Sequence, residues 1–313
     1  SRALRGYFRD WPDCERVFVP LAMYRQEKRI MGMTLDGDIV RRDVARTAVN
    51  FSGHRLGVCA ASEAEFEVIV VCNGCTDATA DCVRHRFPLV TVVELEEASK
   101  TAAINAGIRE SSGPACLLLD ADIELHTDAA RALFEAVCRP GVEAAIGHML
   151  ADTDGADWIV RAFYRVWMEH PYLRNGKFAA SIALSADGLQ RVGALPEVVA
   201  DDSYLRRVLP AGRVAVVDSV RFRVRTPRTA QSLVRVRARS YRGNRELDAL
   251  GSGNQAHFSG EAQGLLKRVA AKPALWPDAL SYFAITLAAR RRSRRDSRTR
   301  WERDITTRTP SAG

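Results

Sequence analysis

"LLLDADIEL", residues 117–125, places two carboxylates directly after an apolar run. The run ends at Asp120, and Asp122 follows with one alanine between them. Continuous apolar residues without alternation are typical of a strand that is covered on both faces. In open α/β sheets, ligands bind at the carboxyl ends of such strands. The stretch therefore predicts a buried strand with a polar site at its end.

Strands and helices alternate on the N-terminal side of this stretch. The expected strands are residues 66–71, 89–95 and 115–120. One expected helix follows the turn "NGCTDAT", and a second helix spans residues 100–111. A β-α-β-α-β order is typical of a parallel sheet with right-handed crossovers. We therefore predict an α/β fold with a mostly parallel sheet flanked by helices.

The composition is that of a globular protein of a reducing compartment. Of the 313 residues, 47% are hydrophobic and 27% are charged, which disfavours fibrous and many-pass membrane proteins. Seven cysteines are an odd number, which disfavours a disulfide framework and favours the cytoplasm. Cys72 and Cys75 form a single CxxC, which we interpret as two thiols flanking a tight turn rather than as zinc ligands or a redox pair.

The formal net charge of +8 is spread unevenly. Arginines gather in residues 206–245 and 290–303, so this part of the chain should attract phosphates, anionic lipid or nucleic acid. No helix-turn-helix, zinc-finger or RNP-like aromatic pattern accompanies these arginines. Nucleic acid is therefore not an expected partner.

The acid pair has a functional and a structural interpretation. Two carboxylates with one residue between them form a seat for a hard divalent cation, whose remaining positions take waters or phosphate oxygens. Surface turns also produce such pairs. The position of Asp120 and Asp122 after a buried strand, in the same parallel unit as the "NGCTDAT" turn, favours the cation site.

Five stretches in this order resemble the inverting nucleotide-sugar glycosyltransferases of the GT-A fold, the family 2 type that includes cellulose, hyaluronan and dolichyl-phosphate-mannose synthases. They are "FEVIVVCNGCTDAT", "KTAAINAGI", "LLLDADIEL", "VVADDSYLRRVL" and "RVRARSYRGNRE", across about residues 60–250. The resemblance implies transfer of a sugar from a nucleoside diphosphate donor of the UDP or GDP type. It also implies Mg2+ or Mn2+ between the acid pair and the diphosphate.

The resemblance assigns metal and donor roles. It makes Asp122 the metal ligand, with Asp120 beside it as a second ligand that also holds the donor's ribose or sugar. Lys100 and Asn105 match the basic and amide positions at the start of the second expected helix. Lys100 could instead be a solvated lysine at a helix start, and Asn105 a buried amide bonded to backbone.

The turn after the first of these strands departs in part from the family pattern. Asp77 matches the second acidic position of the turn, and Asn73 is a further donor contact. Cys72 stands where the family has an acid that contacts the nucleobase, so the sequence does not predict which nucleobase the donor carries. The family's first strand is only dimly visible within residues 17–30, which leaves an inactive, scaffold-like relative as an alternative.

The resemblance also assigns the catalytic chemistry. Asp202, with Asp201 beside it, matches the general base that takes a proton from the acceptor hydroxyl, while N-capping of a helix is the structural alternative. Arg239 and Arg242 are the expected contacts to the donor phosphates. Ser240 stands where processive synthases have the tryptophan of QxxRW, so a non-processive enzyme is expected. A sugar nucleotidyltransferase is the nearest enzyme alternative, but it would need a glycine-rich phosphate loop near its N-terminus.

Aromatic residues at helical spacing follow the metal site. They are expected to lie mainly in the core rather than to serve as sugar platforms, and His170 is expected to be structural. The aromatic set is Trp158, Phe163, Tyr164, Trp167 and Tyr172.

The expected layout has three parts. Residues 15–250 form the GT-A-like domain with a degenerate first strand, residues 251–304 a helical extension, and residues 305–313 a disordered tail. Residues 274–290 are apolar but too short to span a bilayer at about 20 residues, and arginines follow at once. They predict either a helix packed on the catalytic domain or an amphipathic helix in an anionic interface. Peripheral contact with the inner face of the cell membrane, and a lipid-linked acceptor, are therefore expectations.

Overall fold

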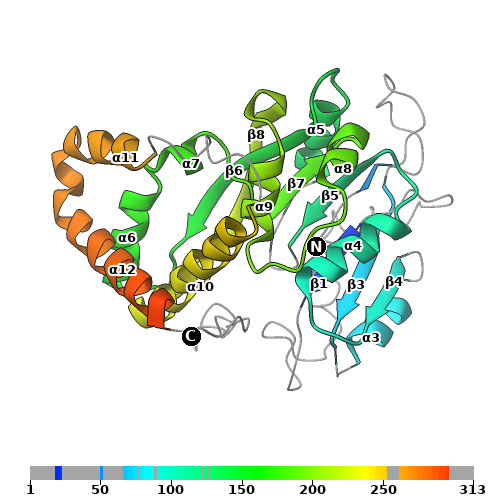
Figure 1. The fold of residues 1–313 in the computed structure, drawn as a ribbon, viewed down its shortest axis with the longest axis horizontal. Helices are drawn as coiled ribbons and strands as arrows, with labels where there is room; N and C mark the ends of the chain where they lie inside the picture. The colour runs from blue at the N-terminus through cyan, green and yellow to red at the C-terminus, as the bar shows by residue number, and fades with distance from the viewer. Residues whose placement is uncertain are drawn as a thin grey trace. The chain divides into compact units, whose positions relative to one another are not determined.

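The computed structural model describes residues 18–22, 50–51, 66–75, 78–87, 90–120, 123, 125, 127–251 and 261–295. Figure 1 shows the order of the helices and strands. Asp77, Asp122 and the expected tail lie outside the described residues. The chain divides into two compact units. Unit 1 contains Ser1–Gly147, Ala179–Glu197 and Leu209–Phe222, and unit 2 contains His148–Phe178, Val198–Val208 and Arg223–Gly313.

A three-stranded parallel sheet forms the first layer of unit 1. Its strands are β1 (Phe18–Ala22), β3 (Ile69–Asn73) and β4 (Thr91–Leu95), in the order β1-β3-β4. All five residues of β3 are buried, as its unbroken apolar run predicts. Helix α4 (Lys100–Glu110) packs against β1 and β3, and α3 (Thr79–Arg86) packs against β4. The first strand is therefore present, and this part of the parallel prediction is confirmed.

A second sheet has the strand order β2-β5-β7-β6-β8. Its strands are β2 (Asn50–Phe51), β5 (Ala115–Leu119), β6 (Ala144–Asp152), β7 (Ser181–Leu184) and β8 (Val214–Arg225). β5 pairs antiparallel with β2 and β7, and β6 pairs antiparallel with β7. The α/β prediction is confirmed, but the sheet arrangement is mixed rather than mostly parallel. The apolar run of β5 could not reveal this, because a strand buried on both faces looks the same in either direction.

Two helices cover β5 and β7. They are α5 (Thr127–Val137) and α8 (Ala186–Val192), and Leu117, Phe134 and Leu184 are fully buried side chains of this core. Helix α8 lies so close to the backbone of Glu143 that a Cβ at Gly188 would be 2.0 Å from the carbonyl oxygen of Glu143. Only a glycine fits at this contact.

Unit 2 is mainly helical. Its helices are α6 (Trp158–Trp167), α7 (Pro171–Arg174), α9 (Asp201–Val208), α10 (Ala230–Ala249), α11 (Glu261–Ala270) and α12 (Trp276–Arg295). Helix α12 packs against α10 and α6, and α11 packs against α7 (Figure 1). Asp157 caps α6, since its Oδ1 accepts from Val160 N–H at 2.8 Å, and its Oδ2 accepts from the N–H of Ala230, the first residue of α10, at 2.9 Å.

Three aromatic residues of α6 lie in the core of this helical layer. Phe163, Tyr164 and Trp167 are buried, and the ring of Phe163 stacks on Tyr282 of α12 with centroids 5.1 Å apart. The core interpretation is therefore confirmed for these three aromatics. Trp158 is instead exposed at the start of α6. α12 is thus a helix packed on the protein, one of the two alternatives for this segment.

Candidate active site

The turn after β3 is hydrogen-bonded to the end of β4 and to the residue that precedes α4, all in unit 1. Asn73 is fully buried, and its Oδ1 accepts from the backbone N–H of Ser99 at 2.9 Å. Among the described residues, Asn73 Nδ2 has no hydrogen-bond partner. Gly74 has a φ of +60°, and its N–H donates to Leu95 O at 2.8 Å. A Cβ there would lie 2.8 Å from the Cβ of Ala98, so the tight approach requires glycine.

Helix α4 begins beside this turn and presents a lysine to the end of β5. Ser99 caps the helix, with its Oγ accepting from Ala102 N–H at 3.2 Å. Lys100 Nζ lies 2.7 Å from Asp120 Oδ1, and the side chains are 15% and 32% exposed. Lys100 is therefore not a solvated lysine. The structure brings together a cation, a carboxylate and the positive end of a helix, which is an arrangement suited to phosphate.

The backbone around Asp120 is held by the segment before β7. Asp120 N–H donates to Ala180 O at 2.8 Å. Ala180 has a φ of 66°, in the left-handed region that non-glycine residues rarely adopt. Such strain is found preferentially at functional sites. Within the described part of the chain, no three His, Cys, Asp or Glu side chains gather as metal ligands, and the other predicted ligand, Asp122, lies outside it.

Asn105 forms a two-way bond with the backbone of the same unit. Its Nδ2 donates to Leu195 O at 2.8 Å, and its Oδ1 accepts from Leu195 N–H at 2.8 Å. This is the backbone-bonded amide that the sequence left open as an alternative, and it joins α4 to the segment after α8. The donor-binding role of Asn105 stays a prediction.

The two cysteines of the CxxC, Cys72 and Cys75, lie at the same turn and are thiols rather than a disulfide. A hydrogen bond with Cys75 and then burial raise the pKa of the Cys72 thiol well above its usual range. Burial likewise raises the pKa of Cys116 in β5 to about 12. The thiols of Cys72 and Cys116 therefore remain protonated at neutral pH, as expected of structural cysteines.

The second acid pair begins α9 in unit 2. Tyr204 N–H donates to Ala200 O at 3.0 Å, so Asp201 and Asp202 occupy the first two helical positions. Asp202 Oδ1 accepts from Ser203 N–H at 2.8 Å, while Asp201 is buried. Negative charge is stabilised at a helix N-terminus, so α9 provides a suitable position for two carboxylates.

The charge of Asp202 acts on the buried phenol of Tyr172, and Arg206 lies over the ring of that tyrosine. Burial and then the charge of Asp202 raise the pKa of Tyr172, whose OH donates to Phe178 O at 2.9 Å. The guanidinium of Arg206 lies 4.5 Å from the centre of the Tyr172 ring and pairs with Glu261 of α11. The Arg206–Glu261 pair was not predicted from the sequence, because no local motif marks it.

His170 has a structural position next to this cluster. Its Nδ1 accepts from Tyr172 N–H at 3.3 Å and so caps α7. Burial lowers its pKa, which favours the neutral ring that this acceptor role requires. The structural interpretation of His170 is confirmed.

Helix α10 carries the predicted arginines and closely approaches the start of α9. Arg239 is half-buried and Arg242 is buried. A Cβ at Gly243 would lie 2.7 Å from the Cβ of Ala200, directly before Asp201. Gly243 was not predicted from the sequence, although a glycine inside an arginine-rich helix was the available signal.

The predicted site residues are thus shared between the two units. Unit 1 contains Asn73, Lys100, Asn105 and Asp120, of which Lys100 and Asp120 touch. Unit 2 contains both acids at the start of α9 and both arginines of α10. The arrangement in unit 1 suits an anionic, phosphate-bearing ligand beside carboxylates, and the arrangement in unit 2 offers carboxylates for proton transfer.

The fold class is that of the GT-A enzymes, an α/β fold with a mixed sheet flanked by helices. The mannosyltransferase PcManGT from Pyrobaculum calidifontis, described in complex with GDP-Man and Mn2+, is similar at 19% identity over 95% of this chain and 94% of its own, with a TM-score of 0.56. Residues 56–187 match the family model Glycosyl transferase family 2. This segment, a little under half of the chain, is therefore similar in sequence to the glycosyltransferases of family 2.

Other solved structures are less similar. S. aureus TarS 1–349 in complex with UDP-GlcNAc is 16% identical over 61% of this chain and 54% of its own, with a TM-score of 0.40. Mannosyl-3-phosphoglycerate synthase from Rubrobacter xylanophilus is 17% identical over 62% and 67%, with a TM-score of 0.42. No curated protein matches the chain by sequence. Among the described helices, none is both long and apolar enough to cross a membrane.

Proposed function

We propose that the protein transfers a hexose from a nucleoside diphosphate donor to an acceptor hydroxyl, with inversion and without processive elongation. The observation that carries this proposal is the contact between Lys100, at the start of α4, and Asp120, at the end of β5. It places a cation and a helix N-terminus beside a carboxylate within the family 2 segment. A donor of the UDP or GDP type has the negative diphosphate that such a site attracts.

The donor is proposed to lie along the turn after β3 and the start of α4. Lys100 and the N-terminus of α4 attract the diphosphate. The buried amide of Asn73 supplies a hydrogen-bond donor, and Asp77 adds a contact from the same turn. Asn105 maintains the position of α4 through Leu195 while it serves the donor side.

Asp120 and Asp122 are proposed to hold Mg2+ or Mn2+. Carboxylate oxygens are the ligands that such hard cations prefer, and Asp120 has a second oxygen besides the one that contacts Lys100. The fold neighbour PcManGT is described with GDP-Man and Mn2+, which supports this choice. A cation at this position would offset the charge that develops on the leaving diphosphate.

Asp202 is proposed as the general base, with Asp201 beside it. The carboxylate accepts the proton of the acceptor hydroxyl while the hydroxyl oxygen attacks the anomeric carbon from the side opposite the diphosphate, which inverts the configuration. Arg239 and Arg242 of α10 are proposed to neutralise the departing phosphates. Ser240, in place of the tryptophan of processive synthases, supports a single transfer.

The acceptor is proposed to be lipid-linked, and the enzyme to work in the cytoplasm at the inner face of the cell membrane. The basic C-terminal part of the chain supports this location, since anionic lipid attracts arginine.

A panel of sugar nucleotides tests the proposal. The full chain is incubated with GDP- and UDP-hexoses, with Mn2+, Mg2+ or EDTA, and released nucleoside diphosphate and thermal stabilisation are measured. We expect one donor to stabilise the protein and to be consumed only with a divalent ion. Asp202→Asn should lower turnover by about a hundredfold or more without loss of donor binding. Asp120→Asn should weaken donor binding itself.

Asp128→Asn, an exposed acid of α5, is the matched control and should change neither quantity. Donor binding without turnover under any condition would contradict transfer and would favour the scaffold-like alternative. Absence of any effect of the nucleotides would contradict the site altogether.

A further inference from the structure

Helix α12 buries one face against the protein. The buried residues include Tyr282, Ile285 and Ala289, which follow one another at helical spacing. α12 packs mainly against α10 and α6, with a smaller contact to α11. This packing accounts for one side of α12, whereas the large apolar side chains of the opposite side are half exposed or more.

The opposite face of α12 carries large apolar side chains. Trp276 is 57% exposed, Leu280 75%, Phe283 50% and Leu287 50%. Their spacing of four, three and four residues places them in one line along the helix. The Trp276 ring is held in place because its Nε1 donates to Val269 O at 3.2 Å. An exposed, aligned apolar stripe of this kind marks an interaction surface.

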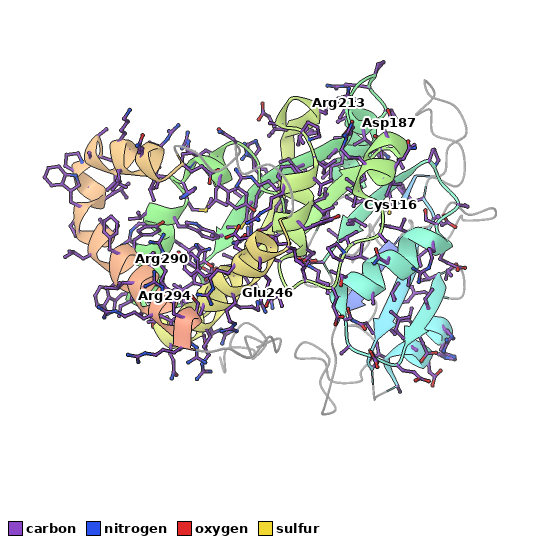
Figure 2. The ribbon with its side chains drawn as sticks, in the orientation of Figure 1. Cys116, Asp187, Arg213, Glu246, Arg290 and Arg294 are labelled. Atoms are coloured by element: carbon purple, nitrogen blue, oxygen red, sulfur yellow. The ribbon has the colours of Figure 1, made fainter. Side chains whose placement is uncertain are left out.

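The stripe ends in positive charge. Arg291 and Arg294 continue the same line of the helix and are exposed, and Figure 2 shows Arg294 on the last turns of α12. Asp278 is the one acidic residue of α12, and both of its oxygens accept from Arg165 at 2.6 Å. The exposed face of α12 is therefore apolar along most of its length and cationic at its C-terminal end.

Helix α11 adds to the same character. It packs against α12 and exposes Leu266, Lys267 and Arg268. These two neighbouring helices thus combine exposed apolar and basic side chains.

We infer that the exposed face of α12 binds the surface of a membrane that contains anionic lipids, with the helix lying in the interface. The occupant has to supply an apolar layer for Trp276, Leu280, Phe283 and Leu287, and negative charge for the arginines. A bilayer surface has both, because its acyl boundary lies directly below anionic headgroups. A second copy of the chain would bring further arginines to the stripe instead of the missing anions.

Vesicle co-sedimentation with the full chain tests this surface. The probes are vesicles of phosphatidylcholine alone and of phosphatidylcholine with phosphatidylglycerol. We expect binding to the anionic vesicles that weakens as salt is raised, because the arginine contacts are screened. The double variant Leu280→Gln with Phe283→Gln should bind at least about tenfold more weakly, because two apolar side chains no longer enter the bilayer.

The charged end of the stripe is tested separately. Arg291→Gln with Arg294→Gln should weaken binding to anionic vesicles and flatten its salt dependence. Leu250→Gln, at another exposed leucine of unit 2, is the control for the apolar change. Arg139→Gln with Arg221→Gln, at exposed arginines of unit 1, is the control for the charge change. Both controls should bind like the unchanged protein.

A second measurement leaves the stripe intact. Brominated lipids should quench the tryptophan fluorescence of the unchanged protein, and Trp276→Phe should remove most of that quenching while Trp158→Phe should not. Sedimentation without vesicles reports self-association. A dimer that dissociates in the Leu280→Gln, Phe283→Gln variant, without vesicle binding by the unchanged protein, would overturn the inference. Vesicle binding needs no sugar nucleotide, so its failure would leave the proposed transfer untouched.

Discussion

At the scale of the residue, single contacts decide whether the start of α4 serves a ligand. Lys100 could be named from its place before an alanine-rich helix, but its contact with Asp120 could not, because twenty residues separate the two along the chain. Asn105 shows the opposite case. Its residue type suggested a contact with a ligand. In the structure, the nitrogen and the oxygen of its side-chain amide are both hydrogen-bonded to the backbone of Leu195.

Lys100→Met should weaken nucleoside diphosphate binding by roughly tenfold or more, because a charge-assisted contact to phosphate is lost. Calorimetric titration with GDP and UDP in the presence of Mn2+ measures the change. Lys272→Met, which removes another paired lysine in unit 2, is the control. Equal affinity in the unchanged protein and the Lys100 variant would exclude Lys100 from the donor site.

Gly188→Ala should lower the free energy of unfolding by about 1–3 kcal/mol, because the new Cβ would meet the backbone oxygen of Glu143. Gly212→Ala is the matched control, since a Cβ there meets nothing within 4 Å. It should change stability by less than about 0.5 kcal/mol. Urea unfolding of both variants measures the difference, and equal midpoints would show that α8 shifts without cost.

At the scale of the element, the C-terminal helices hold the helix that carries the acids. Arg206 of α9 pairs with Glu261 of α11, and it lies over the ring of Tyr172. Gly243 lets α10 approach the residue before Asp201. The start of α9 is thus held by helices that come much later in the chain.

Glu261→Gln should lower kcat severalfold or more while the KM for the donor stays nearly constant, because the substitution loosens α9 without touching the donor side in unit 1. Steady-state kinetics with a varied donor concentration measure both constants. Glu135→Gln, at an exposed position of α5, is the control. A rise in the donor KM with an unchanged kcat would contradict this positioning role of Glu261.

At the scale of the whole molecule, a buried carboxylate links stability to pH. Glu143 is 1% exposed and pairs with Arg191 of α8 and with Arg213 at 2.9 Å. The hydrogen bond from Arg191 is the main cause that lowers the pKa of Glu143. A lowered pKa in the folded state means that this stabilisation is complete above the ordinary glutamate pKa, and is lost as the pH falls through the lowered value.

The thermal midpoint should therefore fall on acidification below about pH 4.3, the ordinary glutamate pKa. Glu143→Gln should lower the midpoint at pH 7 and reduce the part of its acid dependence that Glu143 causes. Thermal unfolding followed between neutral and acid pH compares the two proteins. An identical dependence in both would remove Glu143 as a source of the acid sensitivity.

The sequence by itself determined the α/β class, the order of β3, α4 and β5, and the residue types of the site. These features follow from local periodicity and from motifs, both of which depend on residues that are close together in the sequence. The tertiary structure alone decided the antiparallel partners of β5, the Lys100–Asp120 contact, the Arg206–Glu261 pair and which face of α12 is exposed. The physical reason is that strand direction, ion pairing and burial depend on segments far apart in the chain. A local sequence pattern does not indicate which partner a buried strand or a charged side chain will contact.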